Sequence, residues 1–472
     1  MQSTSSAVVR CQKALSAVLA IAFVLSSSNV FALSTDQFAV KVSATVQRSP
    51  PRITLNWAAD GGASGYTICR KSPGSTDWGA ATNIGNTNSY NDTGVSVGTQ
   101  YEYRIQKSGQ ATGYGYICAA IEASLIERRG KVILLVDSTY AGSLTHELNT
   151  LAQDLVGDGW EVLRRDVPRS TDVVGVKNIV RNDYNSDPGN VKAIYVFGHV
   201  AVPYSGSRAF DGHSNHNGAW PADCFYGEMN GIWTDSSVNA QNNMYQESNN
   251  RPGDGKYDQS TLPSDVEVGV GRVDLINMSK FGSSDTELLR NYLNKAHRYK
   301  HKQMNLQRRG LICDTFGVFG SESFAATGYR NFPPDYGASN VQSVGPNGFV
   351  NALNGGSYQW SYGCGAGSNE TCSGVADTAA FANNDMQTNF VAMFGSWFGD
   401  WNQPNNLLRA PLASRSYILA NVWAGRPHWQ FHHMAMGEPM ADSTKLTQNN
   451  NGLYVTGSSP RGIHIALMGD PT

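Results

Sequence analysis

The segment Lys131-Val-Ile-Leu-Leu-Val-Asp137 decides the fold of the main part of the chain. Its central residues are all apolar, which is typical of a strand buried on both faces of a parallel sheet. Leucines follow at a spacing of three or four residues, at Leu144, Leu148, Leu151 and Leu155, and this spacing predicts an amphipathic helix. A buried strand followed by such a helix is the repeating unit of a doubly wound α/β sheet.

The same alternation continues toward the C-terminus. Strands are predicted near Glu161-Val-Leu and at Ala193-Ile-Tyr-Val-Phe197, with a helix between them from about residue 173 to 184. An amphipathic helix is also predicted from about Asp285 to His301. A further strand at Arg309-Gly-Leu-Ile-Cys-Asp314 begins a second series of strands and helices. The body is therefore predicted to be α/β throughout.

We predict two sub-domains within this α/β body, residues 131–303 and residues 308–472. The first carries a long polar insertion, rich in Gly, Asn and Asp, from about residue 204 to 263. In the second, a helix-rich stretch is predicted from about residue 407 to 440. Motifs in the insertion are expected to lie on loops.

A small all-β domain is predicted before the body, over residues 33–126. Short alternating segments such as Ile53-Thr-Leu-Asn-Trp57 and Tyr101-Glu-Tyr-Arg-Ile105 are separated by turn residues, which indicates an immunoglobulin-like β-sandwich. The tryptophan on an early strand and the Gly-Thr-Gln-Tyr-Glu-Tyr-Arg segment resemble a fibronectin type III module. Such modules serve as spacers or in adhesion and do not define a reaction.

Residues 1–32 have the pattern of a signal peptide of the bacterial type. Arg10 and Lys13 precede an apolar run of about residues 14–25, and Val30-Phe-Ala32 follows a polar stretch. The apolar run is shorter than the roughly 20 residues that a membrane span requires. We therefore predict a secreted or cell-surface protein without a membrane span.

Cysteine content and charge limit the function further. Six cysteines remain after residue 32, and an exported protein is allowed disulfides among them, Cys364 and Cys372 being one candidate pair. The chain has 36 Lys and Arg against 38 Asp and Glu, with a net charge of -2 and no dense basic run. A nucleic-acid partner is not expected for such a surface.

Several motifs in the body, taken together and in this order, resemble the gingipain-type cysteine peptidases. They are Val196-Phe-Gly-His199 with Pro203, Asp223-Cys-Phe-Tyr-Gly227, Gly271-Arg-Val273, Asn354-Gly-Gly356, Tyr362-Gly-Cys-Gly-Ala-Gly-Ser368, Phe394-Gly-Ser-Trp-Phe-Gly-Asp400 and Leu467-Met-Gly-Asp-Pro-Thr472. The resemblance covers the chain from about residue 131 to the end. It implies a caspase-like fold and a peptidase that acts on extracellular polypeptides.

The resemblance also implies a histidine and a cysteine after two neighbouring strands of the second sub-domain. The thiolate attacks the peptide carbonyl and the imidazole protonates the leaving group. In this sequence Ala366 stands where the histidine is expected and Ser396 where the cysteine is expected. A serine without a base is a poor nucleophile at neutral pH, so the chain is predicted to be a pseudo-peptidase if these positions are aligned correctly.

Three alternatives remain open. One is a catalytic site at Ser396 that departs from the family pattern, but Gly395-Ser-Trp-Phe-Gly399 does not have the Gly-x-Ser-x-Gly spacing of a nucleophile elbow, so serine chemistry is not expected. The two others involve different residues. In the first, Cys364 is the nucleophile of a shifted site, and its base comes from His199, His428, His432 or His433. In the second, the chain is a non-catalytic binding or adhesion protein whose partner is an extracellular polypeptide or a cell-surface ligand. A platform of exposed tryptophans would then bind the partner, the candidates being Trp397, Trp401, Trp423 and Trp429.

The polar insertion contains residues of the types that bind metals. Asp211, His213 and His216 lie close together in the sequence and suggest a transition-metal site, although their spacing matches no standard zinc motif. Asp254 and Asp258, on a glycine-bent loop, offer the oxygen ligands that Ca²⁺ prefers. This loop lacks the twelfth-position Glu of an EF-hand. Calcium is the cofactor expected from these residues.

Overall fold

The computed structural model describes residues 33–242 and 244–472. The predicted signal peptide, residues 1–32, lies outside the described residues. Among the residues described, every helix is too short or too polar to cross a lipid bilayer. All six cysteines after residue 32 are free thiols, including the candidate pair Cys364 and Cys372.

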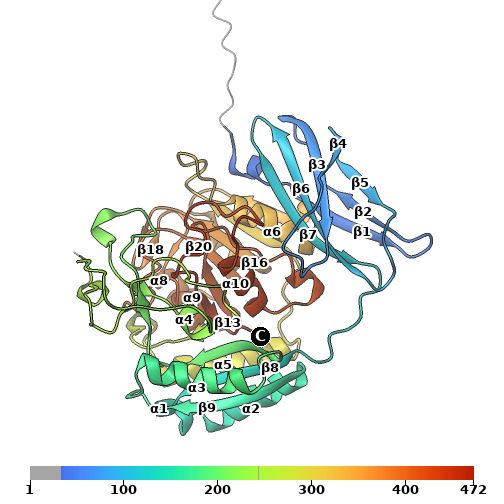
Figure 1. Cartoon of the computed structure of the whole chain (residues 1–472). Helices are drawn as coiled ribbons and strands as arrows, with labels where there is room; N and C mark the ends of the chain where they lie inside the picture. Colours follow the sequence, from blue (N-terminus) through green and yellow to red (C-terminus); the bar gives the residue numbers. More distant parts are fainter. Residues whose placement is uncertain (1–32, 243) are drawn as a thin grey trace, which may run out of the picture. The chain divides into compact units, whose positions relative to one another are not determined.

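The N-terminal part is a sandwich of two antiparallel sheets, of strand order β1-β2-β5 and β4-β3-β6-β7. These strands are β1 (Ser43–Gln47), β2 (Arg52–Asn56), β3 (Ala63–Lys71), β4 (Thr82–Gly85), β5 (Ser89–Asp92), β6 (Gln100–Gly109) and β7 (Gly113–Ala120). Alternate residues such as Ile53, Leu55 and Trp57 point inward and form the core with Ile68 and Tyr103. The predicted all-β sandwich is therefore confirmed (Figure 1).

The body is built on one sheet of ten strands, in the order β15-β14-β16-β20-β21-β22-β13-β10-β8-β9. The strands are β8 (Gly130–Asp137), β9 (Trp160–Val167), β10 (Val191–Phe197), β13 (Gly269–Val273), β14 (Gly310–Asp314), β15 (Val341–Val344), β16 (Tyr358–Cys364), β20 (Thr388–Phe394), β21 (Ala420–Trp423) and β22 (Leu467–Gly469). Neighbours are parallel everywhere except at β21 and β22, which are antiparallel. The two predicted sub-domains thus share one mixed sheet, with each half parallel within itself.

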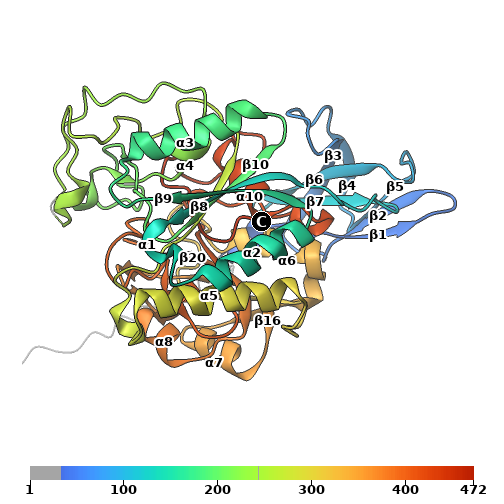
Figure 2. The ribbon, with the colours of Figure 1, turned by 90° about the horizontal axis from the view of Figure 1, so that it is seen from below.

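Helices cover both faces of this sheet, as a doubly wound fold requires. They are α1 (Ser138–Ala141), α2 (Thr145–Gly157), α3 (Val173–Ser186), α4 (Cys224–Gly227), α5 (Asp285–Lys300), α6 (Ala326–Tyr336), α7 (Gly348–Gly355), α8 (Thr378–Asn383), α9 (Ala410–Ala413) and α10 (Met440–Gln448). Short 3-10 helices lie at Thr35–Phe38, Ser214–His216, Gln246–Ser248, Ser279–Phe281, Ala338–Asn340 and Met434–Met436. Figure 2 shows α3 on one face of β8 and β9, and α2 and α5 on the other.

Local sequence explains the ends of these elements. Helix α5 begins at a capping box, in which Ser284 Oγ accepts a hydrogen bond from the Glu287 amide and Glu287 Oε2 accepts one from the Ser284 amide. Basic residues occupy its last turn, where they complement the helix dipole. The helix predicted over residues 285–301 is therefore confirmed, and its caps explain where it begins and ends.

One prediction for the second sub-domain is wrong. The stretch from 407 to 440, expected to be rich in helix, contains the strand β21, the four-residue helix α9 and a 3-10 helix at Met434–Met436, and α10 begins only at its end. Strand β21 is buried on both faces, so its apolar residues show no period that separates strand from helix.

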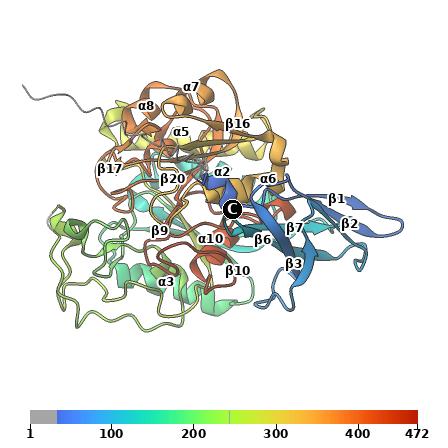
Figure 3. The ribbon, with the colours of Figure 1, turned by 90° about the horizontal axis from the view of Figure 1, so that it is seen from above.

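The insertion of residues 204–263 runs across the body as long loops, seen in yellow-green in Figure 3. Its described residues form the short strands β11 (Tyr204–Ser205) and β12 (Trp220–Pro221), helix α4 and two 3-10 helices. Near it, a small three-stranded sheet follows β16, made of β17 (Gly367–Ser368), β18 (Thr371–Cys372) and β19 (Ala376–Asp377). These two loop regions supply the candidate site.

Candidate catalytic site

Ser396 lies in the turn that follows strand β20, and its hydroxyl meets a histidine from the insertion. The Oγ atom of Ser396 is 2.9 Å from Nε2 of His213, which is 183 residues away in sequence. When Nδ1 of His213 carries the ring proton, the serine hydroxyl donates to Nε2. Ser396 therefore has an imidazole beside it, which comes from a loop that the sequence pattern does not connect to β20.

Trp397 fixes the geometry of this serine turn. Its backbone is left-handed, with φ of 73°, which is unusual for a bulky side chain. The Trp397 amide donates to Asp211 Oδ2 at 3.2 Å, and its ring is stacked with that of His213 at 5.6 Å between centroids. Backbone strain of this kind persists only where the surroundings hold it, and it gathers at functional sites.

A buried group of three side chains joins the two loops beneath the serine. Nδ1 of His216 lies 2.6 Å from Asp211 Oδ2, and Nε2 of His216 is hydrogen-bonded to the carboxylate of Asp400. All three side chains are inaccessible to solvent. The Asp211-His216-Asp400 triad therefore ties the insertion to the segment that carries Ser396.

Hydrogen bonds favour the charged forms of His216 and Asp211, whereas burial raises the pKa of Asp400 above its ordinary value. Burial alone would lower the pKa of His216, but its hydrogen bonds to Asp211 and Asp400 outweigh burial and raise the pKa to about 9. Burial likewise opposes ionisation of Asp211, yet its hydrogen bond to His216 lowers its pKa below the ordinary value. His216 is therefore an imidazolium at neutral pH and does not serve as the base for Ser396.

The two segments that the family resemblance pairs do lie side by side. A Cβ atom on Gly367 would be 2.4 Å from the carbonyl oxygen of Ser396, so only glycine allows this approach. Ala366, the neighbour of Gly367, is exposed and has only a methyl group to offer. The imidazole beside Ser396 thus comes from the insertion and not from the segment after β16.

The surroundings of Cys364 oppose its use as a nucleophile. The thiol is fully buried and donates to Asp314 Oδ1 at 3.1 Å. Burial and the neighbouring carboxylate raise the pKa of Cys364 well above its ordinary value. A thiol in this state is not the reactive thiolate.

The four histidines considered as partners of Cys364 have other contacts. Nδ1 of His199 lies 2.7 Å from Asp274 Oδ2, and Nδ1 of His428 lies 2.5 Å from Thr327 Oγ1. His432 and His433 both lie against Glu102 of the sandwich.

The insertion residues expected to bind a transition metal are engaged otherwise. The His213 ring contacts Ser396, and both ring nitrogens of His216 have carboxylate partners. Asp211 accepts hydrogen bonds from His216 and from the backbone. These contacts favour a positioning network over a metal site.

The two aspartates expected to bind calcium cap turns. Asp258 accepts hydrogen bonds from the Thr234 hydroxyl and from three backbone amides of residues 236–238. Burial slightly opposes ionisation of Asp258, but these donors lower its pKa strongly. Asp254 accepts hydrogen bonds from the amides of Arg251 and Lys256.

The tryptophans do not form an exposed platform. Trp401, Trp423 and Trp429 are fully buried, and only Trp397 is partly accessible. Trp401 packs against the Arg272 guanidinium, at 5.1 Å from the ring centroid. The set divides into core tryptophans and one residue that shapes the Ser396 turn.

No family model matches this sequence, and no curated protein matches it. Among solved structures, it is similar to the Arg-specific cysteine proteinase gingipain R, with 13% identity over 73% of this chain and 77% of that chain at a TM-score of 0.44. It is also similar to the complex of the pro- and mature domains of RgpB from Porphyromonas gingivalis, with 12% identity over 72% and 79% of the chains at a TM-score of 0.45. Its N-terminal part is similar to an Fn3-like protein from Clostridium thermocellum, with 31% identity over 16% of this chain and 83% of that chain at a TM-score of 0.12.

Proposed function

We propose that the protein is a hydrolase of polypeptides in which Ser396 is the nucleophile and His213 is the general base. The observation that carries the proposal is the 2.9 Å contact between Ser396 Oγ and His213 Nε2. A hydroxyl within hydrogen-bond reach of an imidazole is the minimal arrangement for nucleophilic acyl transfer. The peptide substrate is inferred from the sequence resemblance to peptidases.

The reaction would proceed in two steps. Ser396 Oγ attacks the carbonyl carbon of the peptide bond while Nε2 of His213 takes the hydroxyl proton. The proton then passes from His213 to the leaving amine as the C–N bond breaks, which leaves an acyl ester on Ser396. Water, activated by the same imidazole, hydrolyses the ester and regenerates the serine.

The other residues of the site would hold these two groups in place. Stacking of Trp397 on His213 restricts rotation of the imidazole, and the buried triad sets the distance between the insertion and β20. The acid in such sites usually orients the base directly. Here we propose that Asp211 acts on His213 through the backbone, because its Oδ1 accepts from the His213 amide at 3.1 Å.

Covalent labelling tests the proposed nucleophile. A fluorophosphonate probe should phosphonylate Ser396 with release of fluoride, and intact-mass and peptide mass spectrometry would locate the adduct. We expect labelling of the wild type at Ser396 and none in the Ser396→Ala variant. Ser368→Ala is the matched control, because Ser368 is an exposed serine on the neighbouring strand β17.

Two outcomes would contradict the proposal. Labelling that persists in Ser396→Ala but is lost after Cys364→Ser would restore the cysteine alternative. A wild-type chain that is folded by circular dichroism and stays unlabelled would favour the pseudo-peptidase or the adhesion protein, with a polypeptide or cell-surface ligand as its binding partner.

We further propose that the protein acts outside the cell. This rests on the signal-peptide pattern of residues 1–32. Fractionation of the producing cells should find the chain in the medium or on the surface, beginning near residue 33. Recovery of uncleaved chain from the cytosol would contradict the proposal.

Calcium binding at the loop of Asp254 and Asp258 also stays a prediction. If Ca²⁺ binds there, its addition should raise the melting temperature through mass action, and Asp254→Asn should remove the rise. Asp377→Asn is a suitable control, since Asp377 caps helix α8 in a different region. An equal rise in both variants would place the calcium effect elsewhere.

A further inference from the structure

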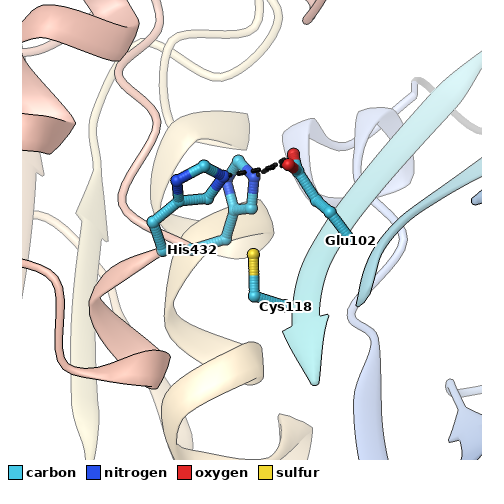
Figure 4. Close-up of side chains that lie close together, drawn as sticks. Glu102, Cys118 and His432 are labelled. Atoms are coloured by element: carbon cyan, nitrogen blue, oxygen red, sulfur yellow. Dashed lines mark hydrogen bonds and ion pairs between the residues drawn. The ribbon is translucent and has the colours of Figure 1, made fainter. Parts of the chain in front are cut away.

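Four side chains with metal-binding atoms meet where the sandwich contacts the body. Figure 4 labels three of them, Glu102, Cys118 and His432. Glu102 on β6 and Cys118 on β7 come from the sandwich, while His432 and His433 come from the body. One ligand atom from each lies within 4.8 Å of the others. Glu102, Cys118 and His432 are buried, and the side chain of His433 is 12% exposed. The sandwich pair and the histidine pair are far apart in sequence, so only the docking of the sandwich on the body brings the two pairs together.

The two imidazoles converge on a single carboxylate. Nε2 of His432 lies 2.8 Å from Glu102 Oε1, and Nε2 of His433 lies 3.0 Å from Glu102 Oε2. Among the described residues, Nδ1 of His432 is buried without a hydrogen-bond partner, and the contact of His433 Nε2 with Glu102 Oε2 lacks hydrogen-bond geometry. A buried unpaired nitrogen is costly, and a bound cation is one way to satisfy it.

The ligand types indicate which cation fits. Two imidazole nitrogens, one thiol and one carboxylate form a mixed nitrogen, sulfur and oxygen set that suits Zn²⁺ and not Ca²⁺ or Mg²⁺. Zinc-ligand bonds of about 2.0 to 2.3 Å in a tetrahedron separate the ligand atoms by roughly 3.3 to 3.7 Å. The ligand atoms of the four residues are separated by 2.8 Å, between His432 and Glu102, to at most 4.8 Å, and this interval includes the zinc distances.

Nearby groups would serve as outer partners of such a metal. Lys71 Nζ lies 2.6 Å from Glu102 Oε2, and the Tyr454 hydroxyl donates to Glu102 Oε1 at 2.7 Å. Carboxylate ligands commonly keep hydrogen bonds of this kind, which fix their orientation. The Lys71 ammonium also offsets the negative charge that a bound Cys118 thiolate adds.

The protonation states of the apo site are compatible with metal binding. Burial is the main reason that the pKa of His432 falls to about 4, so its imidazole is neutral at pH 7. Burial and Glu102 raise the pKa of Cys118, so the thiol keeps its proton until a metal displaces it. Metal binding is therefore expected to release a proton.

We propose that Glu102, Cys118, His432 and His433 form a Zn²⁺ site that links the N-terminal sandwich to the α/β body. A metal held by ligands from both parts binds the docked state and not the undocked one. It therefore stabilises the docked state by mass action. This inference does not depend on the proposed reaction at Ser396.

A second cluster on the surface supplies the matched control. Asp154 of α2 lies 2.8 Å from His297 of α5 and from His301, which follows α5, and both histidine side chains are at least one-third exposed. This cluster contains no thiol. A metal held there would lack a sulfur ligand.

The experiment is metal binding by the mature chain after chelation and dialysis. Zinc content would be measured by plasma mass spectrometry, and Co²⁺ would be added in place of zinc to record its absorption spectrum. We expect one metal per chain and a near-ultraviolet band from thiolate-to-cobalt charge transfer in the wild type. The Cys118→Ser variant should lose the band, and His433→Gln should bind at least about tenfold more weakly, consistent with loss of a ligand.

The control variant His301→Gln should keep both the band and the stoichiometry. Cys118→Ser replaces one atom, and circular dichroism would confirm that this variant is folded. A folded wild type that binds no zinc overturns the proposal. So does binding that survives in Cys118→Ser and disappears in His301→Gln, which would place the metal at the surface cluster.

Discussion

Hydrolysis of peptides by the Ser396→Ala variant is expected to be about 10⁶-fold slower than by the wild type. The methyl group cannot form an acyl ester, and the remaining groups can only assist direct attack by water. His213→Gln should cause a loss of similar size. It removes the group 2.9 Å from the hydroxyl that accepts its proton.

A double variant at Ser396 and His213 tests whether the two residues act together. Two groups that act as one unit show non-additive effects, so Ser396→Ala combined with His213→Gln should be no slower than either single variant. Rates would be measured on a denatured-protein mixture by mass spectrometry and then on the peptide cleaved fastest. Ser368→Ala and Cys364→Ser should retain the wild-type rate, and a large loss in Cys364→Ser would contradict the assignment.

Removal of the His216 side chain is expected to lower the free energy of unfolding by about 3 to 5 kcal/mol. His216→Ala leaves two fully buried carboxylates, Asp211 and Asp400, without their shared partner. It also removes the ring that lies 4.0 Å from that of Trp397. Urea unfolding followed by tryptophan fluorescence would measure the change, with His146→Ala, at an exposed position on α2, as the control.

The pH dependence of this effect has a definite sign. The pKa of His216 is about 9 in the folded chain against an ordinary value of 6.5, so the folded state holds the proton more tightly. A pKa shift of this size adds about 3 kcal/mol to the free energy of unfolding. This stabilisation is present in full below pH 6.5 and is lost as the pH rises through 9. Asp211, with a lowered pKa, contributes above its ordinary value of 3.8 and loses this contribution as the pH falls.

The stability difference between wild type and His216→Ala should therefore be largest from about pH 4 to 6.5 and should shrink toward pH 10. Urea midpoints at pH 6, 8 and 10 would show this trend. A difference that stays constant over this range would mean that His216 is neutral in the folded chain. The triad would then position His213 by packing alone.

The elements that could be predicted from sequence are those whose pattern is local. The buried strand at residues 131–137 and the capped helix at residues 285–300 each show their period and their ends within a short window. Strand β21 could not be recognised, since its residues are buried on both faces and its partner β22 is distant in sequence.

The candidate site was predictable only in part, for a similar reason. The resemblance located Ser396 and Ala366 on segments that prove to be adjacent. The sequence predicts His213 only as a candidate metal ligand in the insertion, because nothing local connects it with a serine 183 positions later. The carboxylates on both sides of His216 are likewise joined by tertiary contacts, which sequence spacing does not reveal.

The antiparallel pairing of β21 with β22 in the large sheet affects the order in which the chain folds. Strand β22 lies between β21 and β13, and it pairs Leu467 with Gly271 and with Val422. The two halves of the sheet are therefore joined only after residue 469 has been synthesised. Contacts between residues so far apart in sequence form late and slowly, because a long loop must close first. Until that strand is inserted, β13 and β21 remain open edges, and the nascent chain is expected to depend on chaperones to keep them from pairing with other chains.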